Sequence, residues 1–244
     1  MIRSGILEGA QANRRHLVLA NGTGYWRSDL VATPPAACGS PPHAGWTPQA
    51  FLVEQDADKS ILPHFHEQNE FQVIVEGDGT FGRHAVAPVT VHYAGRHTGY
   101  GPIHAGPRGL WYLSLRARTD PGARFLPEAR AQMEKGPKRQ LLGEPIEVCT
   151  DAELRDPAPA AIVNALEPQS DGIAAWMLRV PPRAAAQPPA HPPGAARFFV
   201  AIAGEMLWQG ERLPRLGTVF ADSPDFAPAA GDAGLQLLCV QFPC

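Results

Sequence analysis

The chain has 244 residues, 44% of them apolar, and a formal net charge of −3. That length can hold one large β domain or two small ones. The chain has no basic excess that would indicate nucleic-acid binding and no apolar run long enough to span a membrane, so neither partner is expected.

Turn-forming residues are abundant: 26 prolines and 24 glycines separate short aromatic and β-branched runs. This pattern is typical of an all-β chain with many tight turns. The start of the chain leads into no signal-peptide core, and the four scattered cysteines form no CxxC pair. Reduced thiols and a cytoplasmic location are therefore expected.

The first 45 residues are rich in proline towards their end, as in the segment 33–42. They are predicted to form an extended N-terminal arm that packs against a barrel or a second subunit. The sequence leaves the oligomeric state open, and a homodimer is one option.

The most informative segment runs from His64 to Gly77. Side chains on a strand alternate between its two faces, so His64, His66 and Glu70 can all point into one cavity. Two imidazoles and a carboxylate form a site of intermediate softness that suits divalent Fe, Mn, Ni, Cu or Zn. Read as H-x-H-x3-E-x6-G, this spacing resembles the first motif of the cupin superfamily.

A second cupin motif is expected downstream, and the segment Gly99–His104 resembles P-x-G-x-x-H with glycine in the place of the first proline. The resemblance makes His104 the fourth metal ligand. Two further positions depart from the family pattern: Asp58 where the first motif opens with glycine, and Arg108 where the second ends in asparagine. Neither position binds the metal in that family, so the resemblance implies a complete ligand set of His64, His66, Glu70 and His104.

Other polar residues are candidates for the same cavity. Gln72 has the parity of Glu70 and could orient a water or a substrate, and Tyr100 lies within the second motif. Both are candidate catalytic residues. Further along, Tyr112, Ser114 and Arg116 share one face of a predicted strand. Which face is interior stays open, and a solvated Arg116 is the commoner outcome.

The chain also repeats itself. The segment 63–77 aligns without a gap on 190–204, and 109–115 aligns on 234–240 after a shift of two residues. Two sets of short strands, each closed by Gly/Pro turns, predict two jelly rolls in tandem, the arrangement of a bicupin.

The second copy lacks the ligands of the first. His191 keeps the place of His64, but Pro193 replaces His66, Arg197 replaces Glu70, and Ala229 lies near the place of His104. An arginine stays cationic and only donates, so this copy is predicted to be metal-free. It is expected to be a packed structural barrel filled by Phe198 and Phe199. An anion pocket around Arg197 is the alternative.

These observations divide the chain into four predicted parts. They are an arm (1–45), a metal-binding cupin barrel (46–122), a linker with a short helix near 127–136 (123–165) and a degenerate barrel (166–244).

The leading functional hypothesis is a metal-dependent enzyme, an Fe(II)-type dioxygenase of a small organic molecule with one metal per chain. The resemblance also leaves open a non-enzymatic metal-dependent binding or sensing module and a sugar isomerase or epimerase, because a fold does not fix a reaction.

Overall fold

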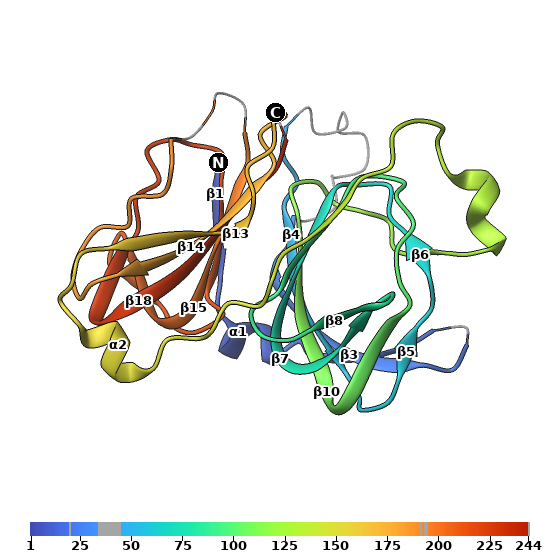
Figure 1. Cartoon of the computed structure of the whole chain (residues 1–244), viewed down its shortest axis with the longest axis horizontal. Coiled ribbons are helices and arrows are strands. Elements are labelled where there is room, and N and C mark those ends of the chain that lie inside the picture. The colour runs from blue at the N-terminus through green and yellow to red at the C-terminus, as the bar shows by residue number, and fades with distance from the viewer. Residues whose placement is uncertain (20, 34–44, 191, 193–194, 244) are drawn as a thin grey trace. The chain divides into compact units, whose positions relative to one another are not determined.

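The computed structural model describes residues 1–243 except 20, 34–44, 191 and 193–194. The chain folds into two compact units: residues 13–146, and residues 1–12 together with 147–244. In each unit, antiparallel strands curl around their own interior (Figure 1). The two units are called the first and the second barrel below. None of the helices in the described part of the chain is long and apolar enough to cross a membrane.

The first barrel is built on one large antiparallel sheet. In sheet order its strands are β12 (Gln140–Leu142), β9 (Val91–Ala94), β7 (Glu70–Phe81), β10 (Ile103–Arg116), β4 (Gln49–Gln55), β3 (Gly24–Val31) and β2 (Arg15–Val18). Two short strands extend it: β5 (Ser60–Ile61) pairs with β10, and β8 (His84–Val86) pairs with β7. A separate ribbon joins β6 (His64–Phe65) to β11 (Arg124–Phe125) and is followed by the 3-10 helix η1 (Glu128–Gln132).

The second barrel has the corresponding sheet. Its strands, in sheet order, are β1 (Ile2–Gly5), β17 (Thr218–Ala221), β15 (Arg197–Trp208), β18 (Ala229–Gln241), β14 (Ala174–Val180) and β13 (Ala161–Leu166), with β16 (Glu211–Leu213) paired to β15. Two short helices belong to it, α1 (Leu7–Gln11) and α2 (Asp151–Arg155). Helix α2 begins at a capping box, in which Thr150 and Glu153 satisfy each other's backbone N–H groups.

The predicted repeat is visible in the backbone at two glycine pairs. Gly77 of β7 and Gly204 of β15 have positive φ angles of 77° and 76°. A Cβ atom there would lie 2.0 Å from the carbonyl oxygen of Gly109 and 2.2 Å from that of Gly234, respectively. Only glycine fits such a position. Each barrel thus has a pair of closely packed glycines at the matching place in its two central strands, Gly77 with Gly109 and Gly204 with Gly234. The sequence alignment predicted this correspondence.

The same strand pair carries the same irregularity in both barrels. In the first, Trp111 faces Glu76 and Tyr112 faces Ile74, so one β7 residue is left out of the ladder. In the second, the ladder between β18 and β15 skips one β15 residue between Ala201 and Ala203. A bulge of this kind shifts which side chains point inward beyond it.

The predicted domain boundaries differ from those of the structure. Within the predicted arm, β1 pairs with β17 of the second barrel, whereas β2 and β3 extend the sheet of the first. Residues 34–44 lie outside the described part of the chain. The predicted linker is also divided, since β11 and β12 pair within the first barrel and β13 pairs with β14 in the second. The short helix expected near 127–136 is the 3-10 helix η1.

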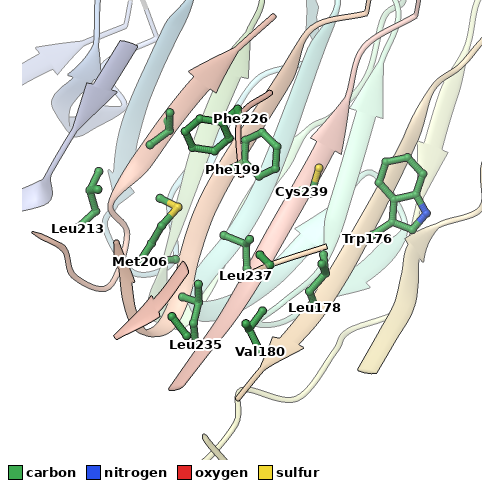
Figure 2. Packing of buried hydrophobic residues seen from close by; sticks show 14 of the residues in the cluster. Trp176, Leu178, Val180, Phe199, Met206, Leu213, Phe226, Leu235, Leu237 and Cys239 are labelled. Carbon is green, nitrogen blue, oxygen red and sulfur yellow. The ribbon is translucent and has the colours of Figure 1, made fainter. Parts of the chain in front are cut away.

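The interior of the second barrel is packed with apolar side chains that β14, β15 and β18 present to one another (Figure 2). Phe199 lies at its centre, with its ring 4.6 Å from that of Phe226. Phe198 points to the other face of the sheet, where it packs on Phe220 and Phe242. The expectation that both phenylalanines fill the interior is therefore wrong for Phe198, because neighbours on a strand face opposite sides.

Candidate metal centre

His64 opens β6 and His66 directly follows this strand, and both are almost fully buried. The Nδ1 of His64 donates to the carbonyl oxygen of Leu62 at 2.7 Å, and the Nδ1 of His66 lies 2.7 Å from Oδ1 of Asp120. Both acceptors require the proton on Nδ1, so the Nε2 of each ring carries a lone pair rather than a proton. Burial lowers the pKa of His64 to about 4, and its neighbour His66 contributes in the same direction, so His64 is neutral near pH 7.

Glu70 opens β7 and has no exposed surface. Its Oε1 accepts from Tyr100 at 2.5 Å, and its Oε2 accepts from Ser114 at 2.6 Å and from Arg116. Burial acts to raise the pKa of Glu70. The charge of Arg116, with the two hydroxyl donors, outweighs it and holds the pKa well below its usual range. Glu70 is therefore an ionised carboxylate.

Tyr100 connects these groups. Its hydroxyl lies 3.0 Å from Nε2 of His64 and accepts from Gln72 at 3.2 Å. The side-chain oxygen of Gln72 in turn accepts from Nδ1 of His92 at 2.8 Å. Burial and the charge of Glu70 raise the pKa of Tyr100 well above its usual value, so the phenol keeps its proton. Gln72 and Tyr100, both predicted from sequence as cavity residues, thus form one buried network with His92.

The predicted fourth ligand is not in this cluster. His104 pairs with Thr80 and Ser60, at the end of β7 opposite Glu70, and its Nδ1 lies 2.9 Å from the hydroxyl of Ser60. It does not line the cavity that the other three reach. Tyr100, four residues before His104, is the residue of the second motif that pairs with His64.

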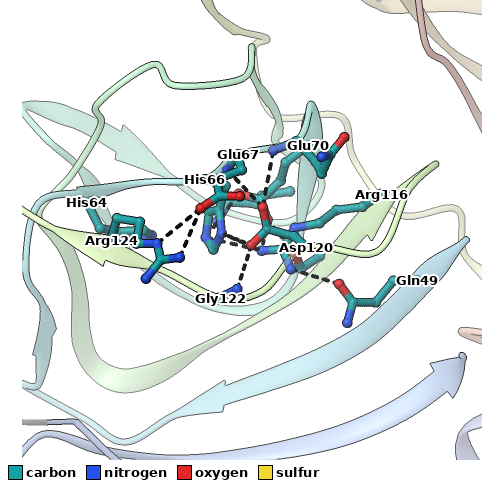
Figure 3. Close-up of polar contacts among 12 residues, drawn as sticks. Gln49, His64, His66, Glu67, Glu70, Arg116, Asp120, Gly122 and Arg124 are labelled. Atoms are coloured by element: carbon teal, nitrogen blue, oxygen red, sulfur yellow. Dashed lines mark hydrogen bonds and ion pairs between the residues drawn. The ribbon is translucent and has the colours of Figure 1, made fainter. Parts of the chain in front are cut away.

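Two residues that the sequence did not assign complete the cluster (Figure 3). Asp120 accepts from the backbone N–H groups of Glu67, Gln68 and Gly122 as well as from His66. Its place before Pro121 and Gly122 indicated a turn, and a turn-capping carboxylate is the signal that could have found it. Arg116 is only 3% exposed and lines the same cavity as Tyr112 and Ser114, so this face of β10 is the interior one.

A cavity of about 90 Å³ opens onto these side chains. This is well below the roughly 300–1,000 Å³ of pockets for drug-sized ligands. Its wall is lined by Leu19, Tyr25, Arg27, Phe51, Val53, Ile61, His64, His66, Glu70, Gln72, Tyr112, Ser114, Arg116, Gly122, Ala123 and Phe125. Only a small chemical group can reach the histidines.

The donor atoms suit a divalent metal in type but are not arranged around one point. His66 Nε2 and Glu70 Oε1 are 4.0 Å apart, and Nη2 of Arg116 lies 3.1 Å from the same His66 Nε2. Among the described residues, no three His, Cys, Asp or Glu side chains are placed to hold one ion. In this structure Arg116 donates hydrogen bonds to both His66 and Glu70. It thus occupies the position between two groups that a metal ion would bind.

The second barrel has different chemistry at the matching positions. Arg197 is 2% exposed and donates to Gln241 and to the backbone oxygens of Pro189 and Ala190, and its guanidinium lies 5.4 Å from the Trp176 ring centroid. These contacts engage its Nε and Nη2 groups within the protein and favour a structural role over an anion pocket. His191 and Pro193 lie outside the described residues.

No protein-family model and no curated protein matches the chain. Solved structures do match across its whole length. A provisionally named dioxygenase from Nostoc punctiforme matches at TM-score 0.60, with 11% identity over 100% of this chain and 79% of that one. The bacterial pirin YhhW from Escherichia coli, in complex with nickel(II), matches at 0.59, with 11% identity over 100% and 99%.

Oxalate decarboxylase from Bacillus subtilis matches at TM-score 0.58, with 11% identity over 100% of this chain and 76% of that one. All three neighbours consist of two cupin barrels in one chain. The chain has the bicupin fold. At this identity the likeness establishes the architecture, and the chemistry has to be argued from the side chains of the first barrel.

Proposed function

We propose that the first barrel binds one divalent transition metal through His64, His66 and Glu70 and acts as a metal-dependent enzyme on a small organic molecule. An Fe(II)-type dioxygenase is the favoured reaction class. The observation that carries the proposal is the orientation of the two histidines. Each has its Nδ1 proton held by an acceptor, so that each Nε2 carries the lone pair through which a metal ion would be bound. Metal-binding histidines are held in this way by their outer partners.

The donor set supports this reaction class. Two imidazoles and one carboxylate with open positions form the site type of non-haem Fe(II) oxygenases. Such an ion, when bound, supplies Lewis-acid and redox chemistry at its open positions. Mn, Ni, Zn and Cu suit the same donors. The nickel(II) complex of pirin YhhW and the name of the Nostoc protein agree with a metal-dependent class, on the fold alone.

The surrounding residues have distinct tasks in this proposal. Asp120 fixes the ring of His66 and keeps its proton on Nδ1. Tyr100 holds a proton at its hydroxyl oxygen, within reach of both Glu70 and His64. Gln72 positions that hydroxyl and is itself positioned by His92. The site therefore has an ionised carboxylate and a protonated phenol side by side, which suits proton transfer to a bound substrate.

Arg116 opposes metal binding in part. Its guanidinium donates to His66 Nε2 and to Glu70, so these hydrogen bonds have to be replaced when an ion binds. A like charge this close also lowers the affinity for a cation. Its second Nη group donates to Gln49 at 3.0 Å, which gives the side chain an anchor outside the cluster.

The test is metal analysis of the purified protein followed by oxygen uptake with a panel of catechols, gentisate, diketones and thiols. Glu70→Gln keeps the size of the side chain and removes its charge, and Glu76→Gln on the same strand is the matched control. We expect stoichiometric metal and oxygen uptake in the wild type and in the control, and loss of both in Glu70→Gln. Stoichiometric metal without oxygen uptake on any substrate would contradict the dioxygenase.

A second function is favoured by the Arg116 contacts. A barrel in which the guanidinium permanently occupies the space between His66 and Glu70 would be a metal-free small-molecule binding module. It predicts no bound metal after incubation with Fe(II), Ni(II) or Zn(II) and ligand binding that is indifferent to chelators.

A further inference from the structure

Two cavities of the first barrel adjoin each other. The outer one, of about 550 Å³, is lined by Leu19, Asn21, Leu62, Ala123, Arg124, Phe125, Glu128, Ala129 and Gln132. Three of these residues, Leu19, Ala123 and Phe125, also line the inner cavity of about 90 Å³ at the histidines. The two cavities therefore share a wall and form an outer and an inner chamber.

Phe125 stands at the junction. Its strand β11 pairs with β6, where Phe125 lies opposite His64, and the two ring centroids are 5.7 Å apart. The residue is only partly buried, which is common for a side chain that faces an open cavity. A molecule that reaches His64 from the outer chamber passes among this ring, Leu19 and Ala123, which line both cavities.

The inner chamber is rich in hydrogen-bond donors. The hydroxyls of Tyr25 and Tyr112 line it and make no hydrogen bond to any other described residue. Two guanidinium groups flank the Phe51 ring, Arg27 at 3.6 Å and Arg116 at 5.2 Å from its centroid. Arg27 is paired with Asp29 at 2.6 Å and Arg116 is paired with Glu70, so each guanidinium keeps only part of its donors for a ligand. Phenolic donors beside these partly engaged guanidinium groups match a ligand group with negatively charged oxygen atoms.

Apolar side chains form much of the wall of the outer chamber. Leu62 is 39% exposed although it precedes the buried histidine strand, and Leu19, Phe125 and Ala129 add apolar surface around it. The charges on its wall are partly neutralised, since Arg124 donates to Glu67 at 2.9 Å. An exposed leucine in a concave wall is a surface that a ligand tail can cover.

We infer that the substrate class of this site is a small organic acid with an apolar tail, whose carboxylate enters the inner chamber while the tail lies in the outer chamber past Phe125. This inference rests on the proposed function for the identity of the reacting site, but the binding step itself needs no metal. In this inference, Arg27 in the inner chamber selects for the carboxylate. The η1 residues that line the outer chamber select for the length of the tail.

Calorimetric titration with straight-chain carboxylates from acetate to decanoate tests the inference, on metal-free protein and on protein incubated with Zn(II). Each methylene buried in the outer chamber should tighten binding about fourfold. Matched alkylamines should bind at least tenfold more weakly than the carboxylates. An affinity that does not change with chain length, no carboxylate binding, or equal binding of amines would each overturn the inference.

Variants separate the two chambers. Gln132→Trp places bulk in the outer chamber from an exposed position, and Ala131→Trp on the same η1 helix is the control that does not line it. Gln132→Trp should weaken octanoate binding about tenfold and leave acetate unchanged, whereas Ala131→Trp should change neither. Arg27→Gln should weaken every carboxylate by a similar factor. Equal effects of the two tryptophans would overturn the tail assignment.

The outcome separates this inference from the proposed function. If Zn(II) does not bind but affinity still rises with chain length, the metal centre fails and the substrate class stands. If metal binds stoichiometrically and no acid binds in either form, the substrate class fails and the metal centre stands.

Discussion

The two barrels place opposite charges at the same point of the same fold. In the first, Glu70 opens β7 and bonds to Arg116 near the end of β10. In the second, Arg197 opens β15 and bonds to Gln241 at the end of β18. The first pair leaves a carboxylate facing a cavity, and the second leaves a guanidinium whose Nε and Nη2 groups donate within the protein.

The neighbouring position shows the same contrast. Gln72 faces His92 across the β7–β9 ladder, and Phe199 faces Val219 across the β15–β17 ladder. The polar pair holds Tyr100 in place, and the apolar pair fills the barrel. The same backbone therefore accepts either polar or apolar side chains at its interior positions. The chemistry of each barrel has to be inferred from its individual residues.

The packing of the second barrel gives the largest expected effect. Phe199→Ala removes a core ring that is 1% exposed, so the free energy of unfolding of this barrel should fall by about 3–5 kcal/mol. Metal content should not change. Hydrogen exchange measured separately on peptides of each barrel checks both statements, and loss of metal from this variant would break the comparison.

Acid should loosen the first barrel before the second. Burial holds the pKa of His64 and of His92 at about 4, below the usual 6.5. The unfolded chain therefore binds more protons between these values, and stability falls as the pH drops from about 6.5 to 4, by up to about 3 kcal/mol for each residue. The described part of the second barrel contains no histidine.

Hydrogen exchange of metal-free protein at pH 7 and pH 5, corrected for intrinsic rates, measures this difference. Protection should be lost in the first barrel and retained in the second. Equal loss in both would contradict the account.

The glycine pair tests the equivalence of the two backbones. Gly77→Ala and Gly204→Ala each force a side chain onto a carbonyl oxygen at positive φ, and each should destabilise its own barrel by about 2–3 kcal/mol. Only Gly77→Ala should also lower metal affinity. Thermal unfolding and metal titration of both variants sharpen the comparison, and a large difference between their stability losses would weaken it.

The smallest expected effect concerns a residue that acts on the metal site through another side chain. Asp120→Asn weakens the acceptor that holds His66 and should reduce metal affinity about 10–100-fold. Asp78→Asn, an exposed pair of Arg108 in the same barrel, is the control and should have no effect. Unchanged metal affinity in Asp120→Asn would show that metal binding does not depend on the hydrogen bond by which Asp120 orients His66.

Local spacing made the fold and half of the site predictable. The alternation at His64, His66 and Glu70 and the two glycines, Gly77 and Gly204, are set within one strand, where sequence distance determines geometry. The predicted bicupin architecture is confirmed by the structural neighbours. Tyr112, Ser114 and Arg116 were placed on one face correctly, but their side of the sheet depended on burial that no single strand reveals.

The rest depended on the lengths of connections. His104 satisfied the motif spacing, yet on β10 it pairs with Ser60 and Thr80, and Tyr100 reaches the cluster instead. Asp120 comes from a turn far from β6 in sequence, and the N-terminal β1 pairs with a strand more than 200 residues away. Contacts of this kind follow from tertiary structure and have no local signature.

The central claim is that one metal site exists, in the first barrel, without His104. Metal content per chain after incubation with Fe(II) and with Ni(II) tests it most directly, in His66→Ala and His104→Ala compared with the wild type. The account predicts that His66→Ala loses more than about 100-fold in affinity, since even outer partners cost 10–100-fold, and that His104→Ala keeps one metal per chain. Retention of metal in His66→Ala, or its loss in His104→Ala, would contradict the claim.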